Sequence, residues 1–81
     1  MSKLEMVARE ILEDTCETDE IFEDYDMDLI DAGYIDSFSI LNVIVGIEEK
    51  TGVHLNPEEI NANNIRTVNS FIDFLRQIVS E

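Results

Sequence analysis

The sequence predicts a small all-α protein, a four-helix bundle with a long first loop and a short third helix. Apolar residues recur every three or four positions in three stretches of the 81-residue chain, and this is the period of an amphipathic helix. Only residues 53–55 alternate as a strand would. We expect residues 1–81 to form one domain with a modest core, because a chain this short buries only about 60–65% of its unfolded surface.

Residues 3–14 are predicted to form the first helix. Ser2 and Glu5 have the S-x-x-E spacing of a capping box, and apolar residues then follow at helical spacing. Residues 15–35 lose this period and are rich in acidic side chains, with a few apolar anchors. They predict a long loop pinned to the core, and the alternative is that a short helical turn near Ile21 shortens this loop. Loops of this length are often functional.

The second helix is predicted to be capped by Asp36, to run to about Lys50 and to be terminated by Gly52. At about 100° per residue it has two apolar faces. One face holds Ile40, Val43, Ile44 and Ile47, and the opposite face holds Phe38, Leu41 and Val45. One face must contact the core. The other is either covered by a further helix or left as an apolar docking strip bordered by acidic residues.

Two further helices complete the predicted bundle. Asn56 as a cap and Pro57 at the first helical position begin a short third helix, which is expected to end among the asparagines of residues 61–64. Thr67 or a neighbour caps the last helix. Its inward stripe consists of Val68, Phe71, Ile72, Leu75, Ile78 and Val79.

The chain is strongly acidic, with 19 acidic residues against 5 basic ones and a formal charge of −14. This charge repels nucleic acids and anionic lipids and attracts basic protein surfaces. Cys16 is the only cysteine, so an internal disulfide is impossible and a reducing compartment fits best. With neither a leader nor an apolar run of about 18 residues, we expect a cytoplasmic monomer that does not insert into membranes.

Ser37 is the main candidate for chemistry. With Asp36 as the cap, Ser37 becomes the first residue of a helix, where unpaired backbone N–H groups favour an anionic group such as a phosphate. Its hydroxyl is therefore a candidate attachment point. Ser39 is expected to return its hydroxyl to Asp36 as part of the cap. We expect no catalysis by the chain itself, because the lone His54 lies too near the far end of the helix to activate the serine.

No metal site is expected. Asp24, Asp26 and Asp28 have the spacing of positions 1, 3 and 5 in a calcium loop, but Leu29 and Ile35 replace the required Gly and Glu. A solvated acidic surface is the favoured interpretation, with a weak divalent-ion site as the alternative. Neither His54 nor Cys16 is assigned to a site.

Four segments occur in a familiar order: Asp36-Ser37-Phe38, Glu48-Glu49, Gly52-Val53-His54-Leu55 and Asn56-Pro57-Glu58-Glu59. In this, residues 25–80 resemble the acyl or peptidyl carrier protein family, in which the serine of a D-S-[LFM] motif bears a 4′-phosphopantetheine arm. The resemblance implies that a phosphopantetheinyl transferase attaches the arm from coenzyme A to Ser37. It also implies an acyl- or aminoacyl-activating ligase and acyl-transferring enzymes as partners, with the cargo held as a thioester.

The chain departs from the pattern of fatty-acid synthesis carriers. Gly33 lies three residues before Asp36, and Ser39 and Asn42 are neutral where acidic residues are usual. The segment Gly33-Tyr34-Ile35-Asp36-Ser37 looks more like D-alanyl carrier proteins, or like stand-alone carriers of polyketide and peptide pathways. The sequence leaves the cargo open between these.

The resemblance implies a partner-binding surface on the second helix. Phe38, Leu41 and Val45 are the candidates for the docking strip, and Asp36, Glu48 and Glu49, with loop acids such as Asp28 and Asp31, are the candidates for steering basic partners. The alternative is a small acidic adaptor or nucleic-acid mimic that binds a basic groove without modification. Such a protein would not need Ser37.

Overall fold

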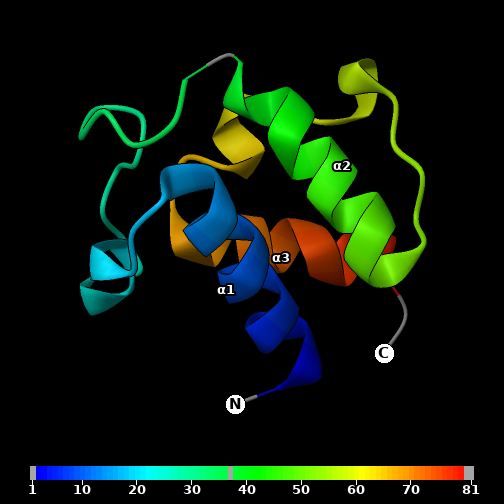
Figure 1. Ribbon diagram of the computed structural model, residues 1–81, viewed down its shortest axis with the longest axis horizontal. Coiled ribbons are helices and arrows are strands. Elements are labelled where there is room, and N and C mark those ends of the chain that lie inside the picture. Colours follow the sequence, from blue (N-terminus) through cyan, green and yellow to red (C-terminus); the bar gives the residue numbers. More distant parts are fainter. Residues whose placement is uncertain (1, 37, 80–81) are drawn as a thin grey trace.

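The computed structural model describes residues 2–36 and 38–79. They form three α-helices, α1 (Lys3–Cys16), α2 (Ser39–Thr51) and α3 (Val68–Ile78), with 3-10 helices η1 (Glu20–Glu23), η2 (Pro57–Glu59) and η3 (Ala62–Asn64). α1 packs against both α2 and α3 (Figure 1). The predicted all-α fold is confirmed, but the described part has three α-helices where four were expected. None of these helices has the length and apolar character needed to cross a membrane.

The first helix begins and ends by local capping. The Glu5 N–H donates to Ser2 Oγ (3.0 Å), as the capping-box spacing predicted. The helix continues to Cys16, two residues beyond the predicted end, where Glu17 takes a left-handed conformation (φ 59°) and donates its N–H to the Glu13 carbonyl. The face of α1 toward the core carries Leu4, Ala8, Ile11 and Leu12.

The long loop after α1 is pinned in the predicted way. Its helical turn forms as η1 around the fully buried Ile21, and Leu29 and Ile35 are also buried. Backbone bonds hold the loop to the start of α3: the Leu29 N–H donates to the Arg66 carbonyl (2.7 Å), and the Asn69 N–H donates to the Tyr25 carbonyl (3.1 Å). The segment that leads to residue 36 therefore has a defined path across the bundle.

In α2 the structure decides which apolar face is buried. Val43, Ile44 and Ile47 contact the core, and the opposite face is exposed. Gly52 ends the helix in a left-handed conformation (φ 77°) and donates its N–H to the Glu48 carbonyl, as predicted. The helix begins at Ser39, however, which is later than predicted because a turn with a bond from the Ser39 N–H to the Asp36 carbonyl (3.0 Å) precedes it.

The predicted third helix is replaced by the two separate turns η2 and η3. Each has its own capping box: the Asn56 N–H donates to Glu59 Oε2 (2.7 Å), and the Asn61 N–H donates to Asn64 Oδ1 (2.9 Å). Between them Ile60 is extended (φ −132°, ψ 141°) and only 3% exposed. The backbone at Ile60 is extended while its side chain is buried, and this interrupts what would otherwise be one continuous helix.

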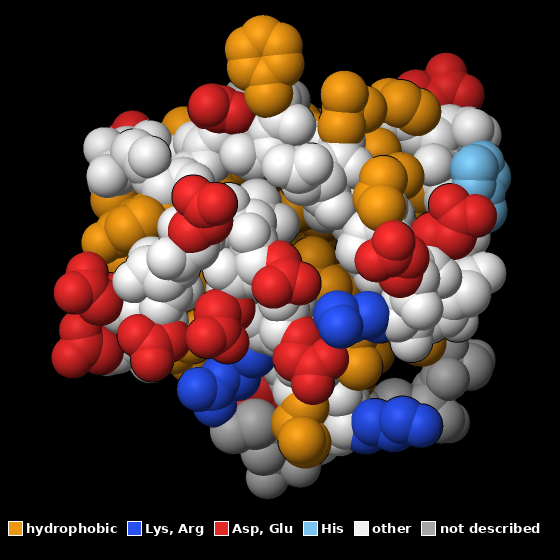
Figure 2. Space-filling model, in the orientation of Figure 1, with side chains coloured by type: hydrophobic (Ala, Val, Ile, Leu, Met, Phe, Trp, Pro, Cys, Tyr) orange, Lys and Arg blue, Asp and Glu red, His pale blue; other side chains and the backbone are white. Residues whose placement is uncertain are grey.

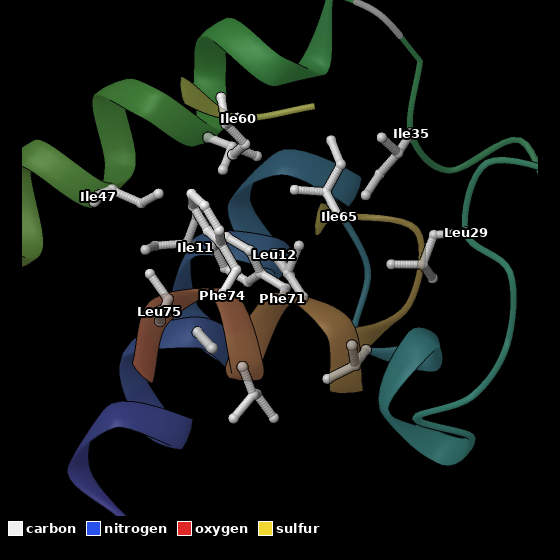
Figure 3. Close-up of a cluster of buried hydrophobic side chains, with 14 of the residues drawn as sticks. Ile11, Leu12, Leu29, Ile35, Ile47, Ile60, Ile65, Phe71, Phe74 and Leu75 are labelled. Atoms are coloured by element: carbon white, nitrogen blue, oxygen red, sulfur yellow. The ribbon is translucent and has the colours of Figure 1, made fainter. Parts of the chain in front are cut away.

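The last helix completes the core, which all three α-helices share (Figure 3). Thr67 caps α3 as predicted, because the Ser70 N–H donates to its Oγ1 (3.0 Å). Phe71 and Leu75 are fully buried, and Phe74 is also buried although the predicted stripe omitted it. Val79 follows the helix as its C-terminal cap.

Gly46 allows α1 and α2 to approach closely. Glycine costs a helix about 1 kcal/mol relative to alanine, and the sequence offers no compensation for this cost. In the structure, a Cβ at residue 46 would lie 3.1 Å from Cγ2 of the buried Ile11. The missing side chain therefore leaves room for Ile11 in the interface between the two helices.

Candidate functional site

The turn before α2 is organised by Asp36. Its Oδ1 accepts the N–H groups of Phe38 (2.9 Å) and Ser39 (3.1 Å). In return the Asp36 N–H donates to Ser39 Oγ (3.2 Å), and the Ser39 hydroxyl donates to Asp36 Oδ1 (3.2 Å). The predicted return of the Ser39 hydroxyl to Asp36 is confirmed. Ser37, the predicted attachment residue, lies outside the described residues, and its two neighbours are exposed.

The hydrogen bonds of Asp36 concern two of the N–H groups at the start of this helix. We expected unpaired N–H groups at the start of this helix to favour an anionic group, but the Asp36 carboxylate already accepts those of Phe38 and Ser39. A phosphate would also meet the negative charge of this carboxylate. These two N–H groups are therefore not open to a phosphate.

An exposed apolar strip follows this turn along α2. Phe38, Leu41 and Val45, which we call the docking strip, are 78%, 56% and 53% exposed. Their spacing of three and four residues places them on one side of the helix. Hydrophobic side chains protrude along the edge of the molecule where α2 lies (Figure 2). The sequence left open whether this face is covered by a further helix or exposed as a docking strip. Within residues 2–36 and 38–79 the structure supports the exposed strip.

Acidic side chains border the strip, as the sequence suggested. Asp36 is exposed at its start, and Glu48 and Glu49 are exposed toward the end of α2. Glu48 has a neighbour of its own, because its Oε2 lies 3.5 Å from Nδ1 of the exposed His54. The carboxylates of Glu48 and Asp36 therefore both have contacts within the chain.

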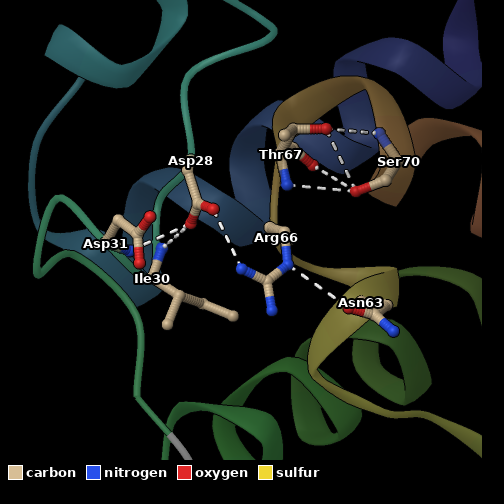
Figure 4. Close-up of polar contacts among 7 residues, drawn as sticks. All are labelled: Asp28, Ile30, Asp31, Asn63, Arg66, Thr67 and Ser70. Carbon is tan, nitrogen blue, oxygen red and sulfur yellow. Dashed lines mark hydrogen bonds and ion pairs between the residues drawn. The ribbon is translucent and has the colours of Figure 1, made fainter.

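Asp28 has an internal partner, in contrast to the exposed Asp31. Arg66 Nη1 donates to Asp28 Oδ2 (2.9 Å), and Asp28 Oδ1 accepts the N–H groups of Ile30 (3.0 Å) and Asp31 (2.9 Å) (Figure 4). Arg66 Nε also contacts Asn63 Oδ1 (3.3 Å). Arg66 therefore joins the long loop to η3, and Asp28 contributes more to loop placement than to an open acidic surface.

The hydrogen bond from the Asp31 N–H, followed by that from Arg66, lowers the pKa of the Asp28 carboxyl below its usual value. A carboxylate with a lowered pKa in the folded state stabilises the fold above the pKa of the unfolded chain, which is about 3.9. This stabilisation is lost as the pH falls through the lower, folded-state pKa. The contribution of Asp28 is therefore fully present at neutral pH.

We expect Asp28→Asn to lower the free energy of unfolding at pH 7, with a difference from wild type that shrinks as the pH falls through the lowered, folded-state pKa of Asp28, below which the wild-type side chain is protonated as well. Urea unfolding at several pH values measures this difference. Asp73→Asn is the matched control, since Asp73 pairs with Arg76 at 3.4 Å on an exposed surface. An Asp28→Asn effect that does not change with pH would show that the carboxylate charge is not the stabilising feature.

Burial raises the pKa of the Cys16 thiol to about 11, so the thiol is protonated at neutral pH and a poor nucleophile. Asp24 Oδ1 accepts the nearby Asp26 N–H (2.9 Å), and Asp26 Oδ1 accepts a hydrogen bond from Asn69 Nδ2 of α3 (2.7 Å). Within the described ranges, no three or more His, Cys, Asp or Glu residues are grouped so that they could hold a metal ion.

Sequence reasoning missed one feature of this surface, a hollow of about 280 Å³ between α1 and α2. Val45 of the docking strip and Glu49 both line it. The one sequence signal was Gly46, a residue without a side chain in a helix that is otherwise largely apolar. Its partner across the interface, Ile11, cannot be deduced from residues near Gly46.

Comparisons with known proteins found a matching family and relatives that cover most of the chain. A family model described as a phosphopantetheine attachment site matches residues 3–75. A D-alanyl carrier protein of Bacillus cereus is 27% identical over 78 residues, covering 96% of this chain and 99% of the relative. A D-alanyl carrier protein of Bacillus anthracis has the same identity and coverage.

Proposed function

We propose, since the chain belongs to the phosphopantetheine attachment site family that matches residues 3–75, that Ser37 is the residue bearing the arm. The chain is a carrier protein with covalently attached 4′-phosphopantetheine. The observation that carries the choice of Ser37 is its place in the sequence between the exposed residues Asp36 and Phe38, two residues before α2 begins at Ser39. An incoming enzyme can reach this turn without opening the core.

Ser37 needs no activation from its own chain. It supplies a hydroxyl whose oxygen forms a phosphodiester bond while the nucleotide part of coenzyme A leaves, and the transferase accepts the proton. Asp36 and Ser39 hold the turn through their reciprocal hydrogen bonds. When bound, the arm supplies a terminal thiol that can hold a carboxylic acid as a thioester. Tethering then raises the effective concentration of the cargo at each partner enzyme.

We infer that the cargo is an aminoacyl group, with D-alanine as the first candidate. This inference is supported by the name of the Bacillus relatives, D-alanyl carrier protein, together with alignment over nearly their whole length. The required partners are a phosphopantetheinyl transferase, an aminoacyl-activating ligase and an acyl-transferring enzyme. The single cysteine and the acidic surface favour a cytoplasmic monomer that binds basic protein surfaces and avoids nucleic acid.

Intact-mass spectrometry tests the proposal. After incubation with coenzyme A and a promiscuous transferase, the chain is expected to gain the mass of one phosphopantetheine arm, and no mass without coenzyme A. The loaded chain is then offered D-alanine, other amino acids and short acids with a matching ligase. A chain that stays unmodified while a control carrier is loaded would favour the alternative, an acidic adaptor that binds a basic groove without modification.

The acidic border of the docking strip predicts a salt-dependent effect. Reversing Glu48 and Glu49 to lysine is expected to lower the kcat/KM of arm attachment about tenfold at low salt, because it weakens attraction to a basic partner. The effect should shrink as salt screens the charges. Glu20→Lys with Glu23→Lys makes the same charge change in η1, away from α2 (Figure 1). Equal rates in the two double variants would remove the steering role of Glu48 and Glu49.

A further inference from the structure

The hollow between α1 and α2 has a mixed polar and apolar lining. Ile11 and Gly46 contribute to it where the two helices are in contact, although Ile11 itself is only 1% exposed. Asp14 of α1 and Glu49 of α2 also line it, and both are exposed. In the middle of the face shown in Figure 2, acidic side chains and one basic side chain surround a recess in which hydrophobic surface is visible. The hollow thus combines a surface for methylene groups with two carboxylates at its mouth.

Within the described part of the chain, these two carboxylates have no cationic partner. Neither Asp14 nor Glu49 forms an ion pair there, and no residue lining the hollow is basic. Lys50 follows Glu49 in the sequence, but its Nζ lies 3.2 Å from Glu10 Oε2. The Thr15 hydroxyl donates to the Ile11 carbonyl (2.9 Å). The charge of the hollow is therefore negative and open to a positive group from outside.

The size and position of the hollow indicate what kind of group it accepts. Its volume of about 280 Å³ lies below the range of about 300–1,000 Å³ that is usual for small-molecule sites. One long side chain would suit it better than a cofactor. Lysine and arginine bury their methylene stems on apolar surfaces and keep their charged ends near polar groups. Val45 belongs both to the hollow and to the docking strip, so a protein on the strip can reach the hollow.

We propose that this hollow is the seat for one arginine or lysine side chain of the transferase that docks on the strip. The proposal rests on the proposed carrier function, which requires this enzyme. It extends the docking surface from α2 onto α1 and gives Asp14 a role that the sequence did not indicate. The stem of the basic side chain would lie on Val45 and Gly46, and its charged end between Asp14 and Glu49.

The chemistry of the seat can be tested on the unmodified chain. We would titrate the 15N-labelled protein with N-acetylarginine N-methylamide and with the uncharged citrulline analogue, and record amide shifts. The arginine compound is expected to shift the Thr15, Asn42 and Gly46 amides with a dissociation constant on the order of millimolar, because exposed ion pairs are weak. The citrulline compound is expected to bind at least about fivefold more weakly.

Two double variants distinguish binding in the hollow from a general effect of the net charge. Asp14→Asn with Glu49→Gln is expected to weaken arginine binding about tenfold, whereas Asp19→Asn with Glu20→Gln removes the same charges near η1 and should leave it unchanged. Equal binding of the citrulline compound, or equal effects of both double variants, would overturn the proposal. Equal binding of D-alanine N-methylamide would assign the hollow to a short ammonium group and would overturn it too.

Docking is measured with the transferase itself. The Asp14→Asn, Glu49→Gln chain is expected to show a KM several-fold higher than the control double variant, with an unchanged kcat. An unchanged KM would overturn the seat while leaving Ser37 as the attachment residue. Conversely, a wild-type chain that binds the arginine compound but never gains the arm would contradict the carrier proposal alone.

Discussion

Ser37→Ala is expected to gain no mass with coenzyme A and a phosphopantetheinyl transferase, under conditions in which the wild-type chain gains one arm. The substitution removes the only atom that we assign to the new phosphodiester bond, so the effect should be complete. Intact-mass spectrometry over a time course distinguishes complete loss from slow attachment. An arm on the Ser37→Ala chain would show that another residue is the attachment point.

Ser39→Ala is the matched control, because Ser39 is the nearest other serine and lies two residues further along the chain. Its hydroxyl oxygen accepts the Asp36 N–H at 3.2 Å, and loss of such a capping bond costs about 1 kcal/mol. We expect this variant to fold and to accept one arm. Loss of attachment in both variants, with both folded by circular dichroism, would point to the shape of the turn as the requirement.

Phe71→Ala is expected to lower the free energy of unfolding by about 3–5 kcal/mol, since it removes a large buried side chain and leaves a cavity. Phe71 is fully buried among side chains of α1 and α3 (Figure 3). A domain of this length has a total stability of roughly 4–12 kcal/mol. The variant would therefore lose a large share of its stability, which urea unfolding at 25 °C measures.

Phe38→Ala makes the same chemical change at a residue that is 78% exposed. We expect it to change the free energy of unfolding by less than about 0.5 kcal/mol. A destabilisation as large as that of Phe71→Ala would mean that Phe38 is covered in solution, which would contradict the exposed docking strip. The pair thus tests the core and the strip in one experiment.

Capping and turn residues made much of the chain predictable. Ser2, Gly52 and Thr67 form helix ends from groups within four residues of one another, and such contacts follow from sequence spacing. The reciprocal bonds of Asp36 and Ser39 belong to the same class. The prediction of one continuous third helix was wrong. The local capping signals form two short turns instead, and Ile60 between them is buried by residues that are distant in the sequence.

By itself, the sequence determined the periods of the three α-helices, the turn at Ile21 and the motif around Ser37. Only the tertiary structure decided that Phe38, Leu41 and Val45 are exposed, because the faces of α2 are both apolar and packing partners select one. The same holds for the Asp28–Arg66 bond, which joins residues 38 positions apart, and for the hollow beside Gly46. Helical period and capping arise between near neighbours, whereas burial and cavities depend on which distant segments pack together.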